Sequence, residues 1–315
     1  MSLPMGRAMR EVFGETVAQL ADDDPRIVML DGDLGSSTKA DIFEHAHRDR
    51  FLQMGIAEQN MIGVAAGLAT MGLIPFISTF VSFAVVRPLD QVRVLIAQTG
   101  LNVKLTAGYA GLFTGMAGKT HQIVDDISIM RAMPGMVTVS PADDVEAAQV
   151  IRWAAGYDGP VYVRIVRDAT QRLFDDAYAF RVGAAVEVRR GGDLTLIGTG
   201  AQTPRLVDAA DLLAADGIDA AVLHLPTLKP LDAAAIVAAA DRTGRLVSVE
   251  EHTVIGGLGG AVAEVLAEQR PTPLRRIGLQ DTYTVSAPND VLLDLYGLSA
   301  AKVADQVRAM QWADS

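Results

Sequence analysis

The chain carries no ionisable side chain from Met61 to Val86. Roughly 20 apolar residues are enough to cross a bilayer, so a membrane span is the first interpretation to weigh. Pro75 would break a single helix, glycines and hydroxyl residues interrupt the stretch, and no Lys/Arg cluster flanks it. We therefore predict a buried helix followed by a buried parallel strand, with no membrane contact.

Length and composition indicate two compact domains, because 315 residues exceed what one hydrophobic core usually serves. A formal net charge of -11 without a basic run argues against nucleic acid or anionic lipid as a partner. The absence of cysteine excludes disulfides and thiolate-bound metal. No apolar segment of a signal peptide follows the first residues, so the expected location is cytoplasmic.

Short runs rich in Val, Ile and Leu alternate with helical patterns, which is typical of parallel strands joined by crossover helices. The alternation weakens between Asp168 and Gly192, and we place the boundary between domains 1–178 and 179–315 there. The predicted fold is α/β, with two consecutive three-layer α/β/α domains and mainly parallel sheets. The first domain should contain strands 26–31, 73–78, 103–107, 137–140 and 161–165 and helices 8–20, 58–70, 89–98 and 143–155. The second should contain strands 194–198, 220–225, 246–250 and 275–278 and helices 204–215, 232–240, 259–268, 289–296 and 300–310.

Glu58 leads into the charge-free stretch and is the candidate chemical centre. Burial disfavours an ionised carboxylate unless a partner is supplied, although a glutamate is also well placed in the first turn of a helix. Ligands of open α/β sheets bind beyond the carboxyl ends of the strands. Residues 31–39 follow the first strand with glycines, hydroxyls and Lys39, so they suit either an anion or a helix cap. Residues 115–122 form a second glycine-rich segment with Lys119 and His121, without the spacing of a P-loop.

Several of these motifs, taken in order, resemble the transketolase family and its thiamine-diphosphate relatives. Residues 55–60 (GIAEQN), 78–83 (STFVSF) with Arg87-Pro88, and 119–122 (KTHQ) are similar to the pyrimidine-binding half of transketolase. Residues 249–252 (VEEH) and 256–260 (GGLGG) are similar to its C-terminal domain. The resemblance extends from about Arg7 to the C-terminus and implies both of these domains.

The resemblance implies a role for each matching residue at the cofactor. Glu58 would hydrogen-bond the N1′ nitrogen of the aminopyrimidine of thiamine diphosphate and favour its imino tautomer. Phe80 and Phe83 would line the aminopyrimidine pocket, since an aromatic face stacks on a flat heterocycle. Asp33 is counted with these cofactor-binding residues.

The resemblance also implies a sugar site. His121 would face the reacting end of the donor, where an imidazole exchanges protons near neutral pH. Arg7, Ser37 and Arg167 fall where transketolases bind the terminal phosphate of the substrate. Tyr109 and Ala117 stand where typical transketolases carry a histidine and an aspartate, so the substrate is expected to depart from the standard pentose phosphates. The remaining histidines are expected at the surface or in packing, with His252 at a domain or subunit contact; they are His45, His47, His224 and His252.

No Gly-Asp-Gly motif occurs in the chain, and the nearest segment, Asp31-Gly32-Asp33, has the wrong order. Thiamine-diphosphate enzymes hold the diphosphate through Mg²⁺ in a domain marked by that motif. The resemblance therefore implies the C-terminal subunit of a split transketolase, which binds no metal and has no turnover alone. An N-terminal transketolase subunit would supply the diphosphate and Mg²⁺ site in an α2β2 heterotetramer, with thiamine diphosphate shared between them.

The implied reaction is reversible transfer of a two-carbon ketol unit from a ketose (phosphate) donor to an aldose acceptor. Two alternatives remain open: the β subunit of a 2-oxo acid dehydrogenase, and an inactive structural or regulatory partner with the same fold. A nucleotide site at residues 256–260 is disfavoured because the G-x-G-x-x-G spacing is not met. Close packing of a helix on the sheet is the predicted role of those glycines.

Overall fold

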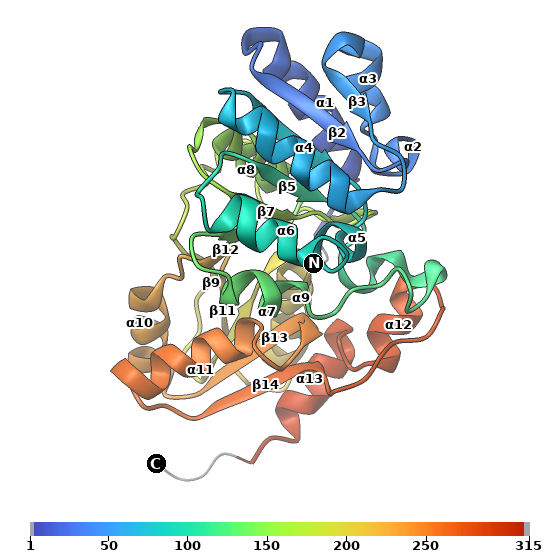
Figure 1. Ribbon diagram of the computed structural model, residues 1–315. Helices are drawn as coiled ribbons and strands as arrows, with labels where there is room; N and C mark the ends of the chain where they lie inside the picture. The colour runs from blue at the N-terminus through green and yellow to red at the C-terminus, as the bar shows by residue number, and fades with distance from the viewer. Residues whose placement is uncertain (1–2, 312–315) are drawn as a thin grey trace.

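The computed structural model describes residues 3–311 and contains two α/β units (Figure 1). The outer limits of the two predicted domains, residues 1 and 315, lie outside the described residues. In each unit, helices flank a mainly parallel sheet, which confirms the predicted fold class. The unit built from the first half of the chain lies above the second in Figure 1.

The first sheet has seven strands in the order β12-β6-β7-β5-β4-β2-β3. Its neighbours pair in parallel except β12, which is antiparallel to β6. A separate two-stranded sheet joins β1 and β8. The strands are β1 (Met5–Ala8), β2 (Ile27–Asp31), β3 (Phe51–Gln53), β4 (Ile74–Ser78), β5 (Lys104–Ala107), β6 (Val137–Val139), β7 (Val161–Arg164), β8 (Ala169–Gln171) and β12 (Thr227–Lys229).

Helices cover both faces of this sheet, α1 packing against α8 and α4 against the π-helical turn η2. The charge-free stretch forms α4 and then the fully buried β4, as predicted. Asp143 caps α8 by accepting the N–H of Glu146 at 2.9 Å. The helical elements are α1 (Met9–Asp23), α2 (Gly35–Thr38), α3 (Asp41–Ala46), η1 (Arg48–Arg50), α4 (Glu58–Thr70), α5 (Val81–Val85), α6 (Leu89–Gln91), η2 (Val92–Ala97), η3 (Gly111–Ala117), α7 (Asp126–Ala132) and α8 (Asp144–Gly156).

The second sheet has five strands in the order β14-β13-β10-β11-β9, parallel except for β9. Helix α9 packs with α13, and α10 packs with α11. The elements are β9 (Val186–Arg189), β10 (Leu194–Gly198), η4 (Gly200–Gln202), α9 (Thr203–Ala214), β11 (Ala220–His224), α10 (Ala233–Thr243), β13 (Leu246–Thr253), α11 (Leu258–Gln269), β14 (Leu274–Leu279), α12 (Asn289–Leu295) and α13 (Ala300–Arg308).

All nine predicted strands are present, and each predicted helix has a counterpart. Two predictions need correction. The helix expected over 89–98 is divided into α6 and the π-helical η2, and the strand expected over 246–250 continues to Thr253. The unpredicted strands β1, β3, β8, β9 and β12 have three or four residues each, too few to show an alternating pattern.

Strand β12 connects the two units. It follows β11 in the second half of the chain, yet Thr227 pairs with Val139 of β6 in the first sheet. The N–H of Ser140 also donates to the carbonyl of Pro226 at 2.8 Å. The seven-stranded sheet therefore includes chain from both sides of residue 178, and the exact domain boundary stays a prediction.

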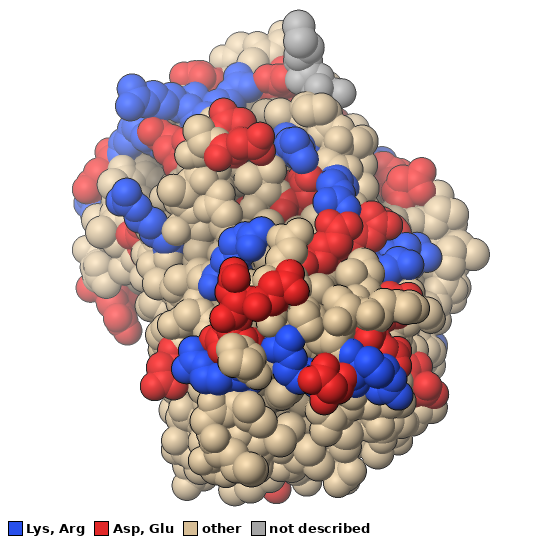
Figure 2. All heavy atoms as spheres, turned by 90° about the horizontal axis from the view of Figure 1, so that it is seen from above, with Lys and Arg blue, Asp and Glu red and all other residues tan. Residues whose placement is uncertain are grey.

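Charges of both signs lie across the upper and middle parts of the face of the described residues that Figure 2 shows, and the lower part of that face carries almost no charge. Lys and Arg side chains alternate there with Asp and Glu, and no large area of one sign is visible. A mixed surface of this kind does not attract a polyanion strongly.

Candidate active site

Glu58 is the first residue of α4 and follows a tightly held loop. Gly55 turns the chain with a φ of 69°, a left-handed conformation that glycine adopts without strain. Gln53 accepts the N–H groups of Gly55 and Asp33 at 3.0 Å each, and its amide donates to Asp31 Oδ2 at 3.0 Å. The loop before α4 is thereby joined to the loop after β2.

The carboxylate of Glu58 is buried but has a partner. Its side chain is 4% exposed, and Arg87 Nη1 donates to its Oε1 at 2.8 Å. The helix N-terminus also favours a negative charge at this position. A pocket of ≈ 390 Å³, lined by residues 56–60 and Arg87, opens beside it. The predicted burial is confirmed, and the partner that makes it tolerable is Arg87.

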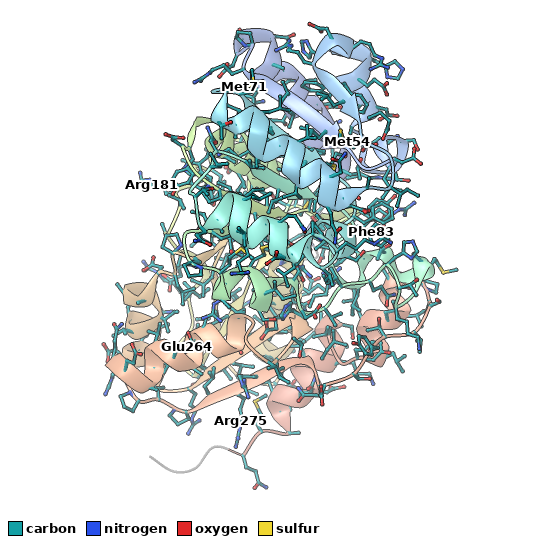
Figure 3. The ribbon with its side chains drawn as sticks, viewed as in Figure 1. Met54, Met71, Phe83, Arg181, Glu264 and Arg275 are labelled. Carbon is teal, nitrogen blue, oxygen red and sulfur yellow. The ribbon has the colours of Figure 1, made fainter. Side chains whose placement is uncertain are left out.

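Phe83 lies directly beside this ion pair, on the side of the N-terminal end of α4 (Figure 3). The Cζ atom of Arg87 is 3.9 Å from the centroid of the Phe83 ring. Phe83 also meets His121 edge-on, with ring centroids 5.3 Å apart, and lies 5.8 Å from Phe80. Arg87, Phe83 and His121 therefore form a continuous row of side chains that begins at Glu58.

A second pocket of ≈ 550 Å³ begins where this row ends. Phe80 stacks on Tyr109 with ring centroids 3.8 Å apart, so Tyr109 covers one face of Phe80. Phe83, by contrast, contacts Arg87. Five residues predicted to contact cofactor or substrate line this pocket together with Ala117: Ser37, Phe80, Tyr109, His121 and Arg167.

Two guanidinium groups meet at the hydroxyl of Tyr109. Its Oη accepts from Arg10 Nη1 at 3.1 Å and from Arg167 Nε at 3.2 Å, and donates to the carbonyl of Ser37 at 3.3 Å. Asp168 accepts from Arg167 at 2.8 Å and provides a carboxylate at this point. Tyr109 adopts a φ of 66°, which is unusual for a residue with a side chain.

Arg10 is a candidate functional residue that the sequence analysis missed. It lies in the first turn of α1, where the helix dipole disfavours a cation. That unfavourable placement is the one signal in the sequence that points to it. Its Nε is buried and has no hydrogen-bond partner among residues 3–311.

The structure does not bring Arg7 or Asp33 to either pocket. Arg7 forms an ion pair with Glu15 at 2.6 Å and lines a separate cavity with Asp144. Arg7 therefore does not lie with Ser37 and Arg167 in this structure, because a carboxylate on the adjoining helix holds it elsewhere, and its role at the substrate stays a prediction. Asp33 is exposed on the loop after β2, where its backbone N–H rather than its side chain makes the contact with Gln53.

The glycine-rich segment 256–260 begins α11, and the chain's own Glu250 occupies that helix N-terminus. Glu250 accepts the N–H groups of Leu258 at 2.6 Å and Gly259 at 2.9 Å. A Cβ at Gly257 would come within 2.0 Å of Glu250 Oε2. A Cβ at Gly259 would come within 2.7 Å of Ser248 Oγ in β13, so the predicted close packing of this helix on the sheet is confirmed. The carboxylate of Glu250 also fills the positions that a phosphate would take.

A buried network joins the two halves of the chain. Arg164 donates to Asp126 Oδ2 at 2.8 Å, and the Tyr162 hydroxyl donates to the same oxygen at 2.6 Å. Burial alone would raise the pKa of Asp126, but the charge of Arg164 and the hydrogen bonds from Tyr162 and Arg164 outweigh it and keep the pKa below its ordinary value. His252 Nε2 accepts the N–H of Ile127 at 3.1 Å, which places this histidine at the contact between the halves, as predicted.

Glu251 belongs to the same interface and contacts a segment of the second pocket. Its Oε1 accepts the N–H of Leu112 in η3, the element that supplies Phe113 and Ala117 to that pocket. Burial raises the pKa of Glu251 to about 7. Its Oε2 has no hydrogen-bond partner within the described part of the chain.

Residues 3–311 contain neither a cluster of metal-ligating side chains nor a helix that could span a membrane. No group of three or more histidine, aspartate or glutamate side chains is placed to hold a metal ion. No helix has both the length and the apolar composition needed to span a membrane.

Comparison with known proteins assigns both halves. Residues 5–172 match the transketolase pyrimidine-binding domain, and residues 183–303 match the transketolase C-terminal domain. A 6-deoxy-6-sulfo-D-fructose transketolase subunit of Clostridium sp. (strain MSTE9) is 40% identical over 295 residues, which cover 94% of this chain and 92% of that protein. An apulose-4-phosphate transketolase subunit of Phocaeicola vulgatus is 37% identical over 292 residues, covering 92% of this chain and 93% of that protein.

A solved structure named "Split gene transketolase, inactive beta4 tetramer" superposes with a TM-score of 0.90. It is 42% identical, with 96% of this chain and 98% of that chain covered. The motifs, the two domain matches and this structural likeness agree. The chain belongs to the transketolase family and comprises its pyrimidine-binding and C-terminal domains, in the manner of the separate C-terminal subunit of a split transketolase.

Proposed function

We propose that this chain is the C-terminal subunit of a thiamine-diphosphate-dependent split transketolase. With its partner subunit it would transfer a two-carbon ketol unit reversibly from a ketose donor to an aldose acceptor. The observation that carries the proposal is the row of side chains from Glu58 through Arg87 and Phe83 to His121, which leads from one pocket to the next. Such a row suits a cofactor that activates a sugar held beyond it.

The residues around Glu58 fit the aminopyrimidine end of the cofactor. Arg87 contacts both the buried carboxylate of Glu58 and the aromatic face of Phe83, so one flat group can reach an acceptor with its edge and an aromatic surface with its face. Glu58 would hold a proton at the N1′ nitrogen, as a positioned carboxyl group can. When bound, thiamine diphosphate supplies the carbonyl-addition chemistry that breaks the carbon–carbon bond of the ketose.

His121 would handle protons on the sugar. Its Nδ1 lies 2.9 Å from Thr120 Oγ1, which leaves Nε2 to exchange a proton with a substrate hydroxyl. The ring lines the second pocket and meets both Phe83 and Phe80 edge-on. It therefore stands between the cofactor end and the sugar end of the proposed site.

The far end of the second pocket would bind an anionic sugar terminus. Arg10 and Arg167 converge on Tyr109 there, and guanidinium groups are well suited to phosphate or sulfonate oxygens. Tyr109 replaces the histidine typical of the family, so we propose a ketose other than the standard pentose phosphates. The relative that acts on 6-deoxy-6-sulfo-D-fructose supports an anionic terminus of this kind.

The N-terminal subunit would cover the Glu58 pocket and supply the diphosphate and Mg²⁺ site. Ile56 is 74% exposed and Val86 is 50% exposed, and they adjoin Glu58 and Arg87 in the sequence. Large apolar side chains at the rim of a site are typical of a protein interface. The lack of a Gly-Asp-Gly motif and the related structure described as an inactive β4 tetramer support the need for a partner. We propose an α2β2 assembly.

The test is Glu58→Gln in the complex reconstituted with the N-terminal subunit. We expect turnover of ketose and aldose pairs to fall by roughly 10²–10⁴-fold, because the amide cannot exchange a proton with the cofactor. The matched control is Glu268→Gln on the exposed face of α11, which should leave turnover within about twofold. Turnover unchanged by Glu58→Gln would instead favour an inactive structural partner.

Binding and substrate assays separate the remaining alternatives. Titration with thiamine diphosphate and Mg²⁺ should show tight binding in the mixture of subunits only. Equally tight binding by this chain alone would refute the shared site. Decarboxylation of pyruvate or branched 2-oxo acids, without ketol transfer, would identify a 2-oxo acid dehydrogenase subunit instead.

A further inference from the structure

Arg87 makes two different contacts in the Glu58 pocket. The edge of its guanidinium donates to Glu58 Oε1 at 2.8 Å, and its Cζ lies 3.9 Å from the centroid of the Phe83 ring. A guanidinium is flat, carries N–H donors along its edge and stacks on aromatic faces. It therefore pairs with a carboxylate and covers a ring at the same time, as a flat amino-substituted heterocycle does.

These are the two groups that the aminopyrimidine is proposed to use. Glu58 Oε1 and the covered face of Phe83 are engaged by Arg87, so a heterocycle that takes the same two contacts must displace it. The backbone of Arg87 is held by Gln59, whose amide donates to the Arg87 carbonyl at 3.2 Å. The side chain is 45% exposed, so it can leave the pocket for solvent without rearrangement of the helices.

We propose that Arg87 is an internal stand-in for the cofactor: it occupies Glu58 and Phe83 in the cofactor-free chain and is displaced by the aminopyrimidine ring. This inference rests on the proposed function, since it takes thiamine diphosphate to be the ligand of Glu58. Arg87 has a physical purpose in the cofactor-free chain, because it gives the buried carboxylate of Glu58 a partner. The arginine supplies that partner until the cofactor does.

Displacement of Arg87 should lower the apparent affinity for the cofactor. If only a fraction of the molecules has the conformation that binds the ligand, the apparent Kd equals the intrinsic Kd divided by that fraction. An ion pair with a half-exposed arginine contributes little free energy, and the stacking of Arg87 on Phe83 contributes a comparable amount. The fraction of molecules in which Arg87 has left the pocket should therefore be about one in ten. Removing the guanidinium should therefore tighten binding by about tenfold.

The experiment measures the Kd of thiamine diphosphate with Mg²⁺ by titration calorimetry in the reconstituted complex. Arg87→Ala should bind thiamine diphosphate about tenfold more tightly than the parent. Arg87→Lys should show a smaller gain in affinity, because its ammonium group still pairs with Glu58 but is not planar and does not stack on Phe83. The matched control is Arg93→Ala in η2, where an exposed arginine pairs with Asp90. Its Kd should equal that of the parent.

A double variant shows whether Glu58 is the contested group. In the Glu58→Gln background, Arg87→Ala should tighten binding much less, because the ion pair is already lost. Unchanged or weaker binding in both Arg87 variants would overturn the stand-in, as would a full tenfold gain in the double variant. If Arg87→Ala does not fold, Arg87→Lys decides. These outcomes differ from failure of the proposed function, in which the parent complex would not bind thiamine diphosphate at all.

Discussion

Glu58 and Glu251 are both buried carboxylates, 4% and 3% exposed, yet their partners differ. Glu58 pairs with Arg87, a side chain that is 45% exposed and borders an open pocket. Glu251 accepts the backbone N–H of Leu112 at the contact between the two halves of the chain, where Arg164 is buried as well. A side chain at the surface can be exchanged for a ligand, and a backbone N–H in the interior cannot.

The comparison shows that burial alone does not identify a functional glutamate. Both residues adjoin runs of mainly apolar residues, and burial raises the pKa of Glu251 to about 7. A shifted pKa is often taken as a sign of catalysis, but buried ion-pair networks produce it too. The informative difference is whether the partner can leave. Three experiments test that difference.

The largest effect should come from breaking the interface network. Arg164→Met removes the cation that pairs with Asp126 at 2.8 Å and leaves a fully buried carboxylate uncompensated. We expect the free energy of unfolding to fall by about 3–5 kcal/mol in urea denaturation. Arg190→Met, at a surface arginine paired with Glu187, should change it by no more than about 0.5 kcal/mol. Similar small losses in both variants would mean that the interface does not behave as a buried region.

The pH dependence of stability should reveal Glu251. Its pKa is raised from 4.5 to about 7 on folding, so its contribution to stability is present below about pH 4.5 and is lost as the pH rises through 7. Glu251→Gln cannot ionise. The variant should therefore gain about 3 kcal/mol relative to the parent between pH 4.5 and pH 8, measured by denaturation at each pH. Parallel pH profiles for the parent and the variant would show that Glu251 does not titrate in this range.

The smallest effect on stability should come from Glu58. Glu58→Gln removes an ion pair whose arginine is half-exposed, and such pairs contribute about 1 kcal/mol or less. The free energy of unfolding of the isolated chain, measured by urea denaturation, should therefore change little, although turnover of the complex is expected to fall strongly. A loss as large as that of Arg164→Met would place Glu58 among the structural carboxylates.

Much of the fold could be predicted from local pattern. Strands such as β2 and β4 are continuous apolar runs with buried side chains, and α4 begins at Glu58 and ends at Thr70 as predicted. Strands of three or four residues were missed, because so few residues show no period. The pairing of β12 with β6 was missed for another reason: it joins segments far apart in the chain, which no local pattern records.

The candidate site was predicted in part. Ser37, Tyr109, His121 and Arg167 line one pocket, and motif order was enough to nominate them. Arg7 is held elsewhere by Glu15, a contact set by the direction of a flexible side chain. The roles of Arg10 and Arg87 likewise depend on which groups lie opposite them in space.

The sequence by itself determined the alternation of strands and helices, the burial of Glu58 and the family motifs, because these depend on residues near one another in the chain. Only the tertiary structure decided the partners. It paired Glu58 with Arg87, placed Glu250 at the start of α11 and buried Glu251 against η3. The reason is physical: a carboxylate's chemistry depends on the charges and donors within a few ångströms, and folding brings those from distant segments.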